Sequence, residues 1–253
     1  MAKKQKVEIY IAAHKKFTEP SNKMYIPLHV GAKGKNDLGY TKDSTGKNIS
    51  TKNPNYCELT GLYWIWKNSK ADVVGLVHYR RYFYKNIFKG KKNILSEKDI
   101  LKYLDKYDAI IAPKGYTWGT TLKEEYKKDH IEDDMIKCEK IIKKKYKDYY
   151  PVYIELMNGN HYSPFNMVIT RKEVFDDYCK WLFDIFDDLE KEIDVNDGRS
   201  NYDKRVFGFL SERLFNVWLL KNHCKTKEVF VMNNEESILK QKVQYVIKKI
   251  IKG

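Results

Sequence analysis

The 253-residue sequence lacks most of the features that mark common classes of protein. Its cysteines are only four, and they lie far apart without a C-x-x-C pair: Cys57, Cys138, Cys179 and Cys224. Neither a zinc site nor a disulfide framework is therefore indicated. No apolar run approaches the about 18 residues that a membrane-spanning helix needs. No G-x-S-x-G, H-E-x-x-H or P-loop motif occurs, so the hydrolases and nucleotidases with these motifs are not indicated.

The composition indicates a globular chain with an anionic partner. Hydrophobic residues make up 42% and aromatic residues 14%, enough for a substantial core. Lysine and arginine outnumber the acids 48 to 34, for a net charge of +14. This excess favours nucleic acid, a phospholipid surface or the phosphates of a nucleotide-sugar as partner. The chain leads straight into a predicted strand, so we expect no signal peptide and a cytoplasmic location.

Predicted strands and helices alternate along the chain, which is typical of a mostly parallel sheet flanked by helices. We predict strands at residues 7–13, 24–30, 72–83, 108–113, 165–170 and 228–232. We predict helices at residues 55–68, 96–107, 122–158, 173–193 and 207–220. The glycine-bearing loop at residues 31–51 is long for a compact domain, and is either a functional segment or a solvated loop.

No linker or internal repeat divides the chain, so we expect a single α/β domain at residues 1–236. The tail at residues 237–253 places apolar residues at helical spacing among many lysines. We predict a basic amphipathic helix there. Such a helix either lies on an anionic membrane surface or covers the core, and the sequence leaves both open.

The segment at residues 72–83 joins a buried strand to a cluster of charge. It begins as a continuous apolar run, as a buried parallel strand requires. If the strand continues to its end, His78 and Arg80 share one face, and Tyr79 and Arg81 share the other. Ligands of open α/β sheets bind at the carboxyl ends of the strands, and these side chains favour a phosphorylated ligand. The alternative is an edge strand with solvated arginines.

Three further residues are candidates for the site, each with a plainer alternative. Glu212 stands in a predicted helix that is apolar on nearly every side, where a carboxylate is costly unless paired or functional. It is either a catalytic group or a structural partner of Arg205 or Arg213. Glu58 either points into the site above the sheet or lies at the surface. His161 follows a turn-rich stretch, and is either a ligand or part of a loop.

The pattern as a whole points towards a transferase. A metal-dependent nucleotide-sugar transferase usually carries Asp-x-Asp at the end of a central strand, where it holds a divalent metal against the diphosphate. No Asp-x-Asp occurs in this sequence, and His78-Tyr-Arg80 stands at the corresponding place. Arginine can neutralise a diphosphate leaving group without metal through bidentate charge-assisted bonds. We therefore expect no metal ion and no other cofactor.

Several longer motifs resemble one bacterial family over nearly the whole chain. They are His14-Lys15 and residues 27–32 (PLHVGA), 45–50 (TGKNIS), 53–68 (NPNYCELTGLYWIWKN), 75–83 (GLVHYRRYF) and 208–214 (GFLSERL). The family is domain of unknown function 4422, found in capsule, exopolysaccharide and O-antigen (lipopolysaccharide) loci. The resemblance implies a GT-A-like, Rossmann-like glycosyltransferase that transfers galactofuranose from a UDP-sugar. Family members tend to carry an acid after the Thr-Gly pair, where this chain has Lys47, so we assign that position no ligand role.

Carried over to this sequence, the resemblance implies a division of roles. The uridine would lie at the end of the first strand, at Ala12, Ala13 and His14. The diphosphate and adjoining donor groups would lie among Lys15, His78, Tyr79, Arg80 and Arg81. The general base of an inverting displacement would be Glu212, with Glu58 and Asp203 as competing carboxylates. The acceptor side would include His161, Asn166 and Glu58.

The expected partners are a UDP-sugar donor and a saccharide acceptor. The acceptor can be lipid-linked, which would bring the protein to the cytoplasmic face of the inner membrane. One alternative is a transferase with another hexose donor. A second is a nucleotidyl- or phosphotransferase, which normally needs metal-holding acids. A third is a basic nucleic-acid-binding protein, although no recognisable binding motif supports it and we expect no nucleic acid.

Overall fold

The computed structural model describes residues 5–86, 93–237 and 241. Among these residues the main sheet has nine strands, seven of them in the order β10-β6-β9-β4-β1-β2-β3. The seven strands are β1 (Val7–Ala13), β2 (Tyr25–His29), β3 (Thr41–Lys42), β4 (Val73–His78), β6 (Ala109–Ile111), β9 (Val168–Arg171) and β10 (Thr226–Glu228). Only β9 in this row runs antiparallel to its neighbours, which confirms the predicted mostly parallel sheet.

Two further strands extend the sheet beyond β4. Strand β5 (Arg81–Phe83) pairs antiparallel with β4, and β11 (Val231–Asn233) pairs antiparallel with β5. A separate two-stranded sheet consists of β7 (Gly115–Tyr116) and β8 (His161–Tyr162). The predicted last strand at residues 228–232 is therefore two short strands, β10 and β11, which lie in different parts of the sheet.

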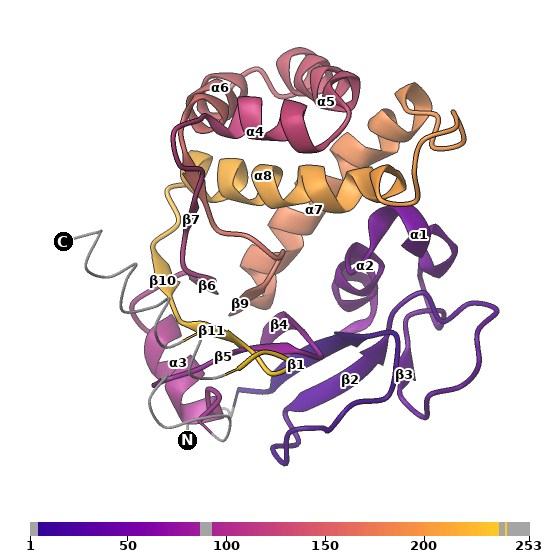
Figure 1. Cartoon of the computed structure of the whole chain (residues 1–253). Coiled ribbons are helices and arrows are strands. Elements are labelled where there is room, and N and C mark those ends of the chain that lie inside the picture. The colour runs from indigo at the N-terminus through magenta and orange to yellow at the C-terminus, as the bar shows by residue number, and fades with distance from the viewer. Residues whose placement is uncertain (1–4, 87–92, 238–240, 242–253) are drawn as a thin grey trace.

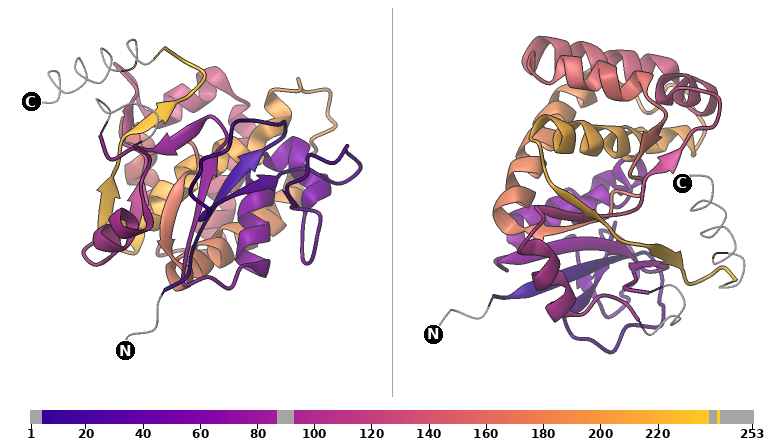
Figure 2. Two further views of the ribbon diagram at one scale, coloured as in Figure 1. Left: turned by 90° about the horizontal axis from the view of Figure 1, so that it is seen from below. Right: turned by 90° about the vertical axis from the view of Figure 1, so that its left-hand side faces the viewer.

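Helices cover both faces of the sheet. They are α1 (Asn53–Tyr56), α2 (Leu59–Asn68), α3 (Glu97–Leu104), α4 (Leu122–Asp129), α5 (Glu132–Lys145), α6 (Tyr150–Asn158), α7 (Lys172–Glu192) and α8 (Val206–Lys221). Helices α2, α7 and α8 pack on one face in a large core, and α3 packs on the other face in a smaller one. Figures 1 and 2 show that α4, α5 and α6 form a further layer beyond α8.

Alternating side chains of β1 enter these two cores, as the period of a buried strand requires. Ile9 and Ile11 pack with α3, whereas Tyr10 and Ala12 pack on the side of α2 and α8. The predicted capping of α3 is also confirmed. The Ser96 hydroxyl accepts from the Asp99 backbone N–H, and the Asp99 carboxylate accepts from the Ser96 N–H.

Two predicted helices are divided in the structure. The helix predicted at residues 55–68 breaks after α1, because Cys57 adopts a left-handed φ of 53°. The predicted helical region at residues 122–158 consists of α4, α5 and α6. Hydrophobic spacing alone does not reveal such breaks, since the apolar positions keep a similar period on either side of them.

The long loop at residues 31–51 is organised around a buried carboxylate. Asp43 accepts hydrogen bonds from the backbone N–H groups of Gly31 and Ala32, at 2.7 and 3.0 Å, and from the Ser50 hydroxyl. Gly31 has a φ of 64°, and a Cβ there would lie 2.4 Å from the Asn53 side chain. The loop is therefore anchored beside β2 at Asp43, although most of its other residues are exposed, and both sequence alternatives stay open.

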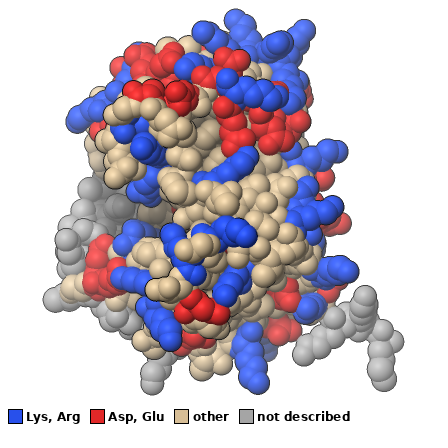
Figure 3. All heavy atoms as spheres, turned by 90° about the vertical axis from the view of Figure 1, so that its right-hand side faces the viewer, with Lys and Arg blue, Asp and Glu red and all other residues tan. Residues whose placement is uncertain are grey.

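The predicted helix in the tail falls almost entirely on residues outside the described part of the chain. Within the described part, no helix combines the length and the apolar character that crossing a bilayer would require. On the face shown in Figure 3, acidic side chains gather mainly in the upper part, and lysines and arginines are spread over the rest. This face carries no continuous basic stripe of the kind that tracks a nucleic-acid backbone.

Candidate active site

The chain reverses direction directly after β4. The strand ends at His78, a turn follows at Tyr79 and Arg80, and β5 begins at Arg81 opposite His78. The prediction of one continuous strand at residues 72–83 is wrong, so the two-face placement that depended on it does not apply. Instead, the turn lies at the carboxyl end of β1. Ala12 is paired with His78, and the Ala12 carbonyl accepts a hydrogen bond from the Tyr79 N–H at 3.1 Å. The sequence-predicted donor residues therefore do gather at one edge of the sheet.

Lys15, Tyr79 and Arg80 form a cationic cluster at this edge. The Lys15 ammonium lies 5.0 Å from the Tyr79 ring centroid, and the Arg80 guanidinium lies 5.8 Å from the same centroid. The imidazole of His14 meets the same ring edge-on at 5.2 Å. Glu235, from the segment after β11, pairs with Lys15 at 3.1 Å and with Arg80 at 3.6 Å. The cationic cluster thus already holds one carboxylate.

A large cavity adjoins the cationic cluster. Its volume is about 1080 Å³, slightly above the about 300–1,000 Å³ of typical small-molecule sites. Residues 15–22 form one side, and the rest of the lining includes Tyr79, Tyr82, Tyr84 and Glu235. Such a cavity at the carboxyl ends of β1 and β4 is where an open α/β sheet binds its ligand.

His78 and Arg81 contact a different part of the chain from Lys15 and Arg80. His78 Nε2 donates to the carbonyl of Phe165 at 2.8 Å, and the Arg81 guanidinium lies 4.7 Å from the Phe165 ring centroid. Burial lowers the pKa of His78, so it is neutral at pH 7. The predicted donor residues therefore separate into the cationic cluster and a second group against Phe165.

Phe165 and Asn166 adopt left-handed φ angles of 78° and 51°, and the strand predicted from residue 165 begins only at Val168. Two consecutive non-glycine residues in this conformation store backbone strain, which often occurs at functional sites. Hydrogen bonds to residues distant in sequence hold them. Phe165 N–H donates to Glu212 at 2.8 Å, and Asn166 donates to Glu58 at 2.7 Å and accepts from Ser211 at 2.9 Å.

Glu212 lies on α8 among residues that are otherwise mostly buried, as its sequence context predicted. Its side chain keeps 19% exposure. Burial and, to a smaller extent, the Glu58 carboxylate raise its pKa to about 7, although Arg213 and the Phe165 N–H oppose the shift. The carboxyl group therefore changes protonation state near neutral pH, as a general acid or base must.

Arg213 is the structural partner that the sequence suggested, but Glu212 is not its main contact. Its guanidinium lies 3.8 Å from Glu212 and 3.1 Å from Glu125, and it also donates to a backbone carbonyl of α8. The rings of Tyr126 and Tyr162 lie 5.2 and 4.9 Å from it. Because Glu125 is its nearer acid, Arg213 only partly offsets the cost of burying Glu212.

Glu212 opens into a cavity of about 230 Å³, which we call the carboxylate cavity. Its lining is Glu58, Glu125, Asp129, His130, Tyr162, Tyr202, Arg205, Gly208, Phe209, Glu212 and Arg213. Two predicted acceptor residues are absent from this lining. Asn166 is buried behind Glu58, and His161 packs 5.3 Å from the ring of Tyr116. Asp203 is also absent, and its carboxylate accepts from the Ser200 hydroxyl.

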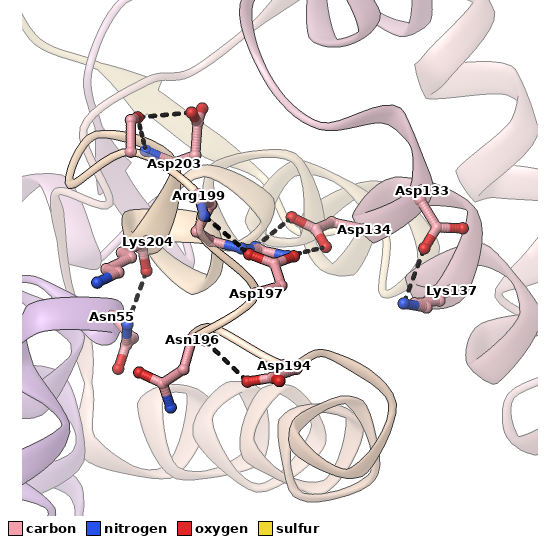
Figure 4. Close-up of polar contacts among 11 residues, drawn as sticks. Asn55, Asp133, Asp134, Lys137, Asp194, Asn196, Asp197, Arg199, Asp203 and Lys204 are labelled. Atoms are coloured by element: carbon pink, nitrogen blue, oxygen red, sulfur yellow. Dashed lines mark hydrogen bonds and ion pairs between the residues drawn. The ribbon is translucent and has the colours of Figure 1, made fainter.

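A buried ion pair fixes the connection between α7 and α8. Arg199 makes two hydrogen bonds to Asp134 on α5, at 2.8 and 3.2 Å, and also pairs with Asp197 (Figure 4). The side chains of Arg199 and Asp134 are only 3% and 2% exposed. Asn55 on α1 donates to the carbonyl of Lys204 in the same connection. These contacts set where α8 begins, and so where Arg205 and Glu212 lie.

Sequence reasoning missed several residues that line the carboxylate cavity. Asp129, His130, Tyr162, Tyr202 and Phe209 all line the carboxylate cavity, yet in sequence each is an ordinary member of a helix or turn. The one available signal was the aromatic content of the segments flanking Glu212. In the described part of the chain, no three His, Cys, Asp or Glu side chains are grouped so that they could hold a metal ion.

Residues 8–223 match the family model described as domain of unknown function, DUF4422. The chain belongs to the DUF4422 family. This DUF4422 chain is also similar to a solved structure titled WbbM bifunctional glycosyltransferase, in its apo form. The two are 31% identical with a TM-score of 0.84, over 91% of this chain and 46% of the WbbM chain.

The DUF4422 chain thus spans less than half of the WbbM chain. Their likeness confirms the single-domain α/β fold with a mostly parallel sheet flanked by helices. A search of curated protein sequences finds no match for the DUF4422 chain.

Proposed function

We propose that this protein is a glycosyltransferase of GT-A type that moves a sugar from a UDP-sugar to a hydroxyl of a bacterial surface polysaccharide. The observation that carries the proposal is the likeness to WbbM, described as a bifunctional glycosyltransferase, at 31% identity and a TM-score of 0.84. The match covers 46% of the WbbM chain, as we expect if this protein corresponds to the part of WbbM that carries one of its two activities. Galactofuranose is the donor sugar we favour, because the motif resemblance pointed to it.

The cationic cluster and the adjoining cavity support a donor site. A UDP-sugar carries a diphosphate, and Glu235 already bridges Lys15 and Arg80 as an anion would. In our proposal the diphosphate takes the place of the Glu235 carboxylate. The uridine then lies at Ala12, Ala13 and His14, and the sugar extends towards Arg81 and the Phe165 segment.

The position and pKa of Glu212 support its role as general base. In the proposed inverting displacement, Glu212 takes the proton from the acceptor hydroxyl as its oxygen bonds to the anomeric carbon. The bond between that carbon and the diphosphate oxygen breaks, and UDP leaves with the electron pair. Lys15 and Arg80 stabilise the charge that develops on the diphosphate. Burial keeps the pKa of Glu212 high, and Glu58, held by Asn166, adds to the shift.

The acceptor is a saccharide, and we propose that it is lipid-linked. The protein would then work in the cytoplasm, at the face of the inner membrane. Binding of the purified chain to vesicles that contain a polyprenyl-linked saccharide tests this part of the proposal, because vesicles without the saccharide should bind less.

UDP and UDP-sugars should raise the midpoint of thermal unfolding of this protein, because a ligand that binds only the folded state stabilises it.

Arg80→Ala should weaken UDP binding by roughly 10-fold or more, since a charge-assisted hydrogen bond is lost. Glu235→Gln should instead tighten UDP binding by about 2–5-fold, because an uncharged amide replaces the exposed carboxylate that competes with the diphosphate. Lys102→Ala, on α3, is the matched control and should leave the affinity unchanged. Unaltered UDP binding in Arg80→Ala would remove the cationic cluster from the donor site.

Sugar transfer should persist in EDTA, because the proposed mechanism neutralises the leaving group with lysine and arginine. The measurement is release of UDP from UDP-galactofuranose in the presence of a saccharide acceptor, with and without EDTA. Abolition by EDTA and recovery with added Mg²⁺ or Mn²⁺ would instead favour metal-dependent phosphoryl or glycosyl transfer.

A further inference from the structure

We propose that the carboxylate cavity binds one uncharged sugar residue of the acceptor, with an apolar face of the ring against Phe209 and its hydroxyls directed at the carboxylates. The inference rests on the proposed transferase function, since it names the class of acceptor. It excludes acceptors whose reacting sugar carries a carboxylate or a phosphate. Three properties of the cavity support it: an aromatic wall, an excess of acidic groups and an unpartnered buried donor.

The aromatic wall consists of His130, Tyr202 and Phe209. The rings of His130 and Phe209 are stacked with centroids 4.0 Å apart, and Tyr202 lies 4.9 Å from Phe209. Burial and the nearby Arg213 lower the pKa of His130 to about 4, so its ring is neutral at pH 7. The wall is therefore uncharged, and the parts of these rings that line the cavity offer apolar surface for the C–H groups of a sugar ring.

Acidic side chains dominate the rest of the lining. The four carboxylates are Glu58, Glu125, Asp129 and Glu212, against two arginines. Both arginines are already engaged: Arg213 pairs with Glu125, and Arg205 donates to the Cys57 sulfur at 3.2 Å and lies 5.2 Å from the Phe209 ring. Carboxylates accept hydrogen bonds from sugar hydroxyls but repel an anionic sugar. The cavity therefore favours an uncharged ring.

Arg213 also has a buried donor that nothing in the structure satisfies. Its side chain is 3% exposed, and its Nε has no hydrogen-bond partner among the described residues, as is also true of His130 Nδ1. Buried polar groups without a partner are uncommon and call for an explanation. In our proposal the Arg213 side chain, which lines the cavity, shifts so that a sugar hydroxyl reaches this Nε. The cavity volume of 230 Å³ lies below the about 300–1,000 Å³ of sites for drug-sized ligands, which fits a single monosaccharide unit.

Saturation-transfer NMR on the full chain tests the inference without any transfer reaction. The probes are methyl β-D-galactopyranoside, methyl β-D-glucopyranoside and methyl β-D-glucuronide, the last of which adds a carboxylate. At least one of the uncharged glycosides should bind roughly 10-fold or more tightly than the glucuronide, because of like-charge repulsion. Phe209→Ala should abolish the signal of that glycoside. Tyr107→Ala, an aromatic residue beyond α3 and outside the cavity lining, should not change it.

Asp129→Asn tests the charge argument separately. This substitution removes one carboxylate from the cavity. The ratio between the affinities for the uncharged glycoside and for the glucuronide should therefore fall by a few-fold. Equal or tighter binding of the glucuronide to the unmodified chain would overturn the inference. So would the absence of a signal from both uncharged glycosides, or a signal that persists in Phe209→Ala.

The same samples separate this inference from the proposed function. Thermal unfolding with UDP reports on the cationic cluster, whereas glycoside binding reports on the carboxylate cavity. Glycoside binding without UDP binding would leave the cavity as a site for an uncharged sugar, but would remove the transferase proposal. UDP binding and transfer to a glucuronide would leave the transferase proposal standing and remove the cavity assignment.

Discussion

Glu212→Gln lowers the rate of sugar transfer by about 10²–10⁴-fold while UDP binding stays unchanged: this is the result we expect. The substitution keeps the length of the side chain and its acceptor oxygen for the Phe165 N–H, but an amide cannot take up the acceptor's proton. Transfer is measured as UDP release with product analysis, and binding as UDP-dependent thermal stabilisation. Turnover near the original rate would remove Glu212 from the mechanism.

Two matched variants test whether the effect is specific to Glu212. Asp203→Asn alters a carboxylate outside the cavity lining and should leave transfer nearly unchanged. Glu58→Gln removes a charge that raises the pKa of Glu212, so the pH at which activity appears should move lower. A larger loss in Glu58→Gln than in Glu212→Gln would make Glu58 the base.

The pH profile provides a further readout. The base must be deprotonated, and the pKa of Glu212 is about 7, so kcat/KM should rise with pH through about 7 and then level off. The residual activity of Glu212→Gln should lack this rise. A profile that stays flat between pH 5.5 and 8.5 in the unmodified chain would contradict the assignment, since that window brackets the expected pKa.

Arg199→Met is expected to lower the free energy of unfolding by about 3–5 kcal/mol, because it leaves the Asp134 carboxylate buried without its partner. Arg199 lies in the connection that sets the start of α8, so fraying of this connection would also displace the cavity lining. The measurement is urea denaturation, in which the midpoint should fall with little change in slope.

A second variant in the same region distinguishes the cost of an unpaired charge from general damage. Arg199→Met combined with Asp134→Leu removes both buried charges, and should recover much of the lost stability. Lys137→Met breaks the exposed pair with Asp133 on α5 (Figure 4) and should change stability little. A double variant as unstable as Arg199→Met would show that the loss comes from packing rather than from the charge on Asp134.

The elements with strong hydrophobic patterns were predictable from the sequence. Strand β1 has the predicted bounds, and α7 and α8 each begin within one residue of the prediction. Their apolar residues repeat with the period of the element, and burial of those residues is what stabilises it. Glu212 was recognisable for the same reason, as a carboxylate in a helix that is otherwise apolar.

The geometry of the site was not predictable in the same way. The reversal at Tyr79 and Arg80 places His78 and Arg81 against Phe165, and no local turn signal such as glycine or proline marks it. The left-handed pair Phe165 and Asn166 depends on hydrogen bonds to Glu212 and Glu58, which are distant in sequence. Tertiary contacts determine the backbone at these points, and local propensity does not report them.

The central claim is that Lys15 and Arg80 bind the diphosphate of a UDP-sugar at the carboxyl ends of β1 and β4. A crystal structure of the chain with UDP tests it most directly. We predict diphosphate oxygens within hydrogen-bonding distance of both side chains, with the Glu235 carboxylate displaced from them. UDP bound at another place, or a diphosphate held by a metal ion on carboxylates while Glu235 keeps its ion pairs, would contradict the account.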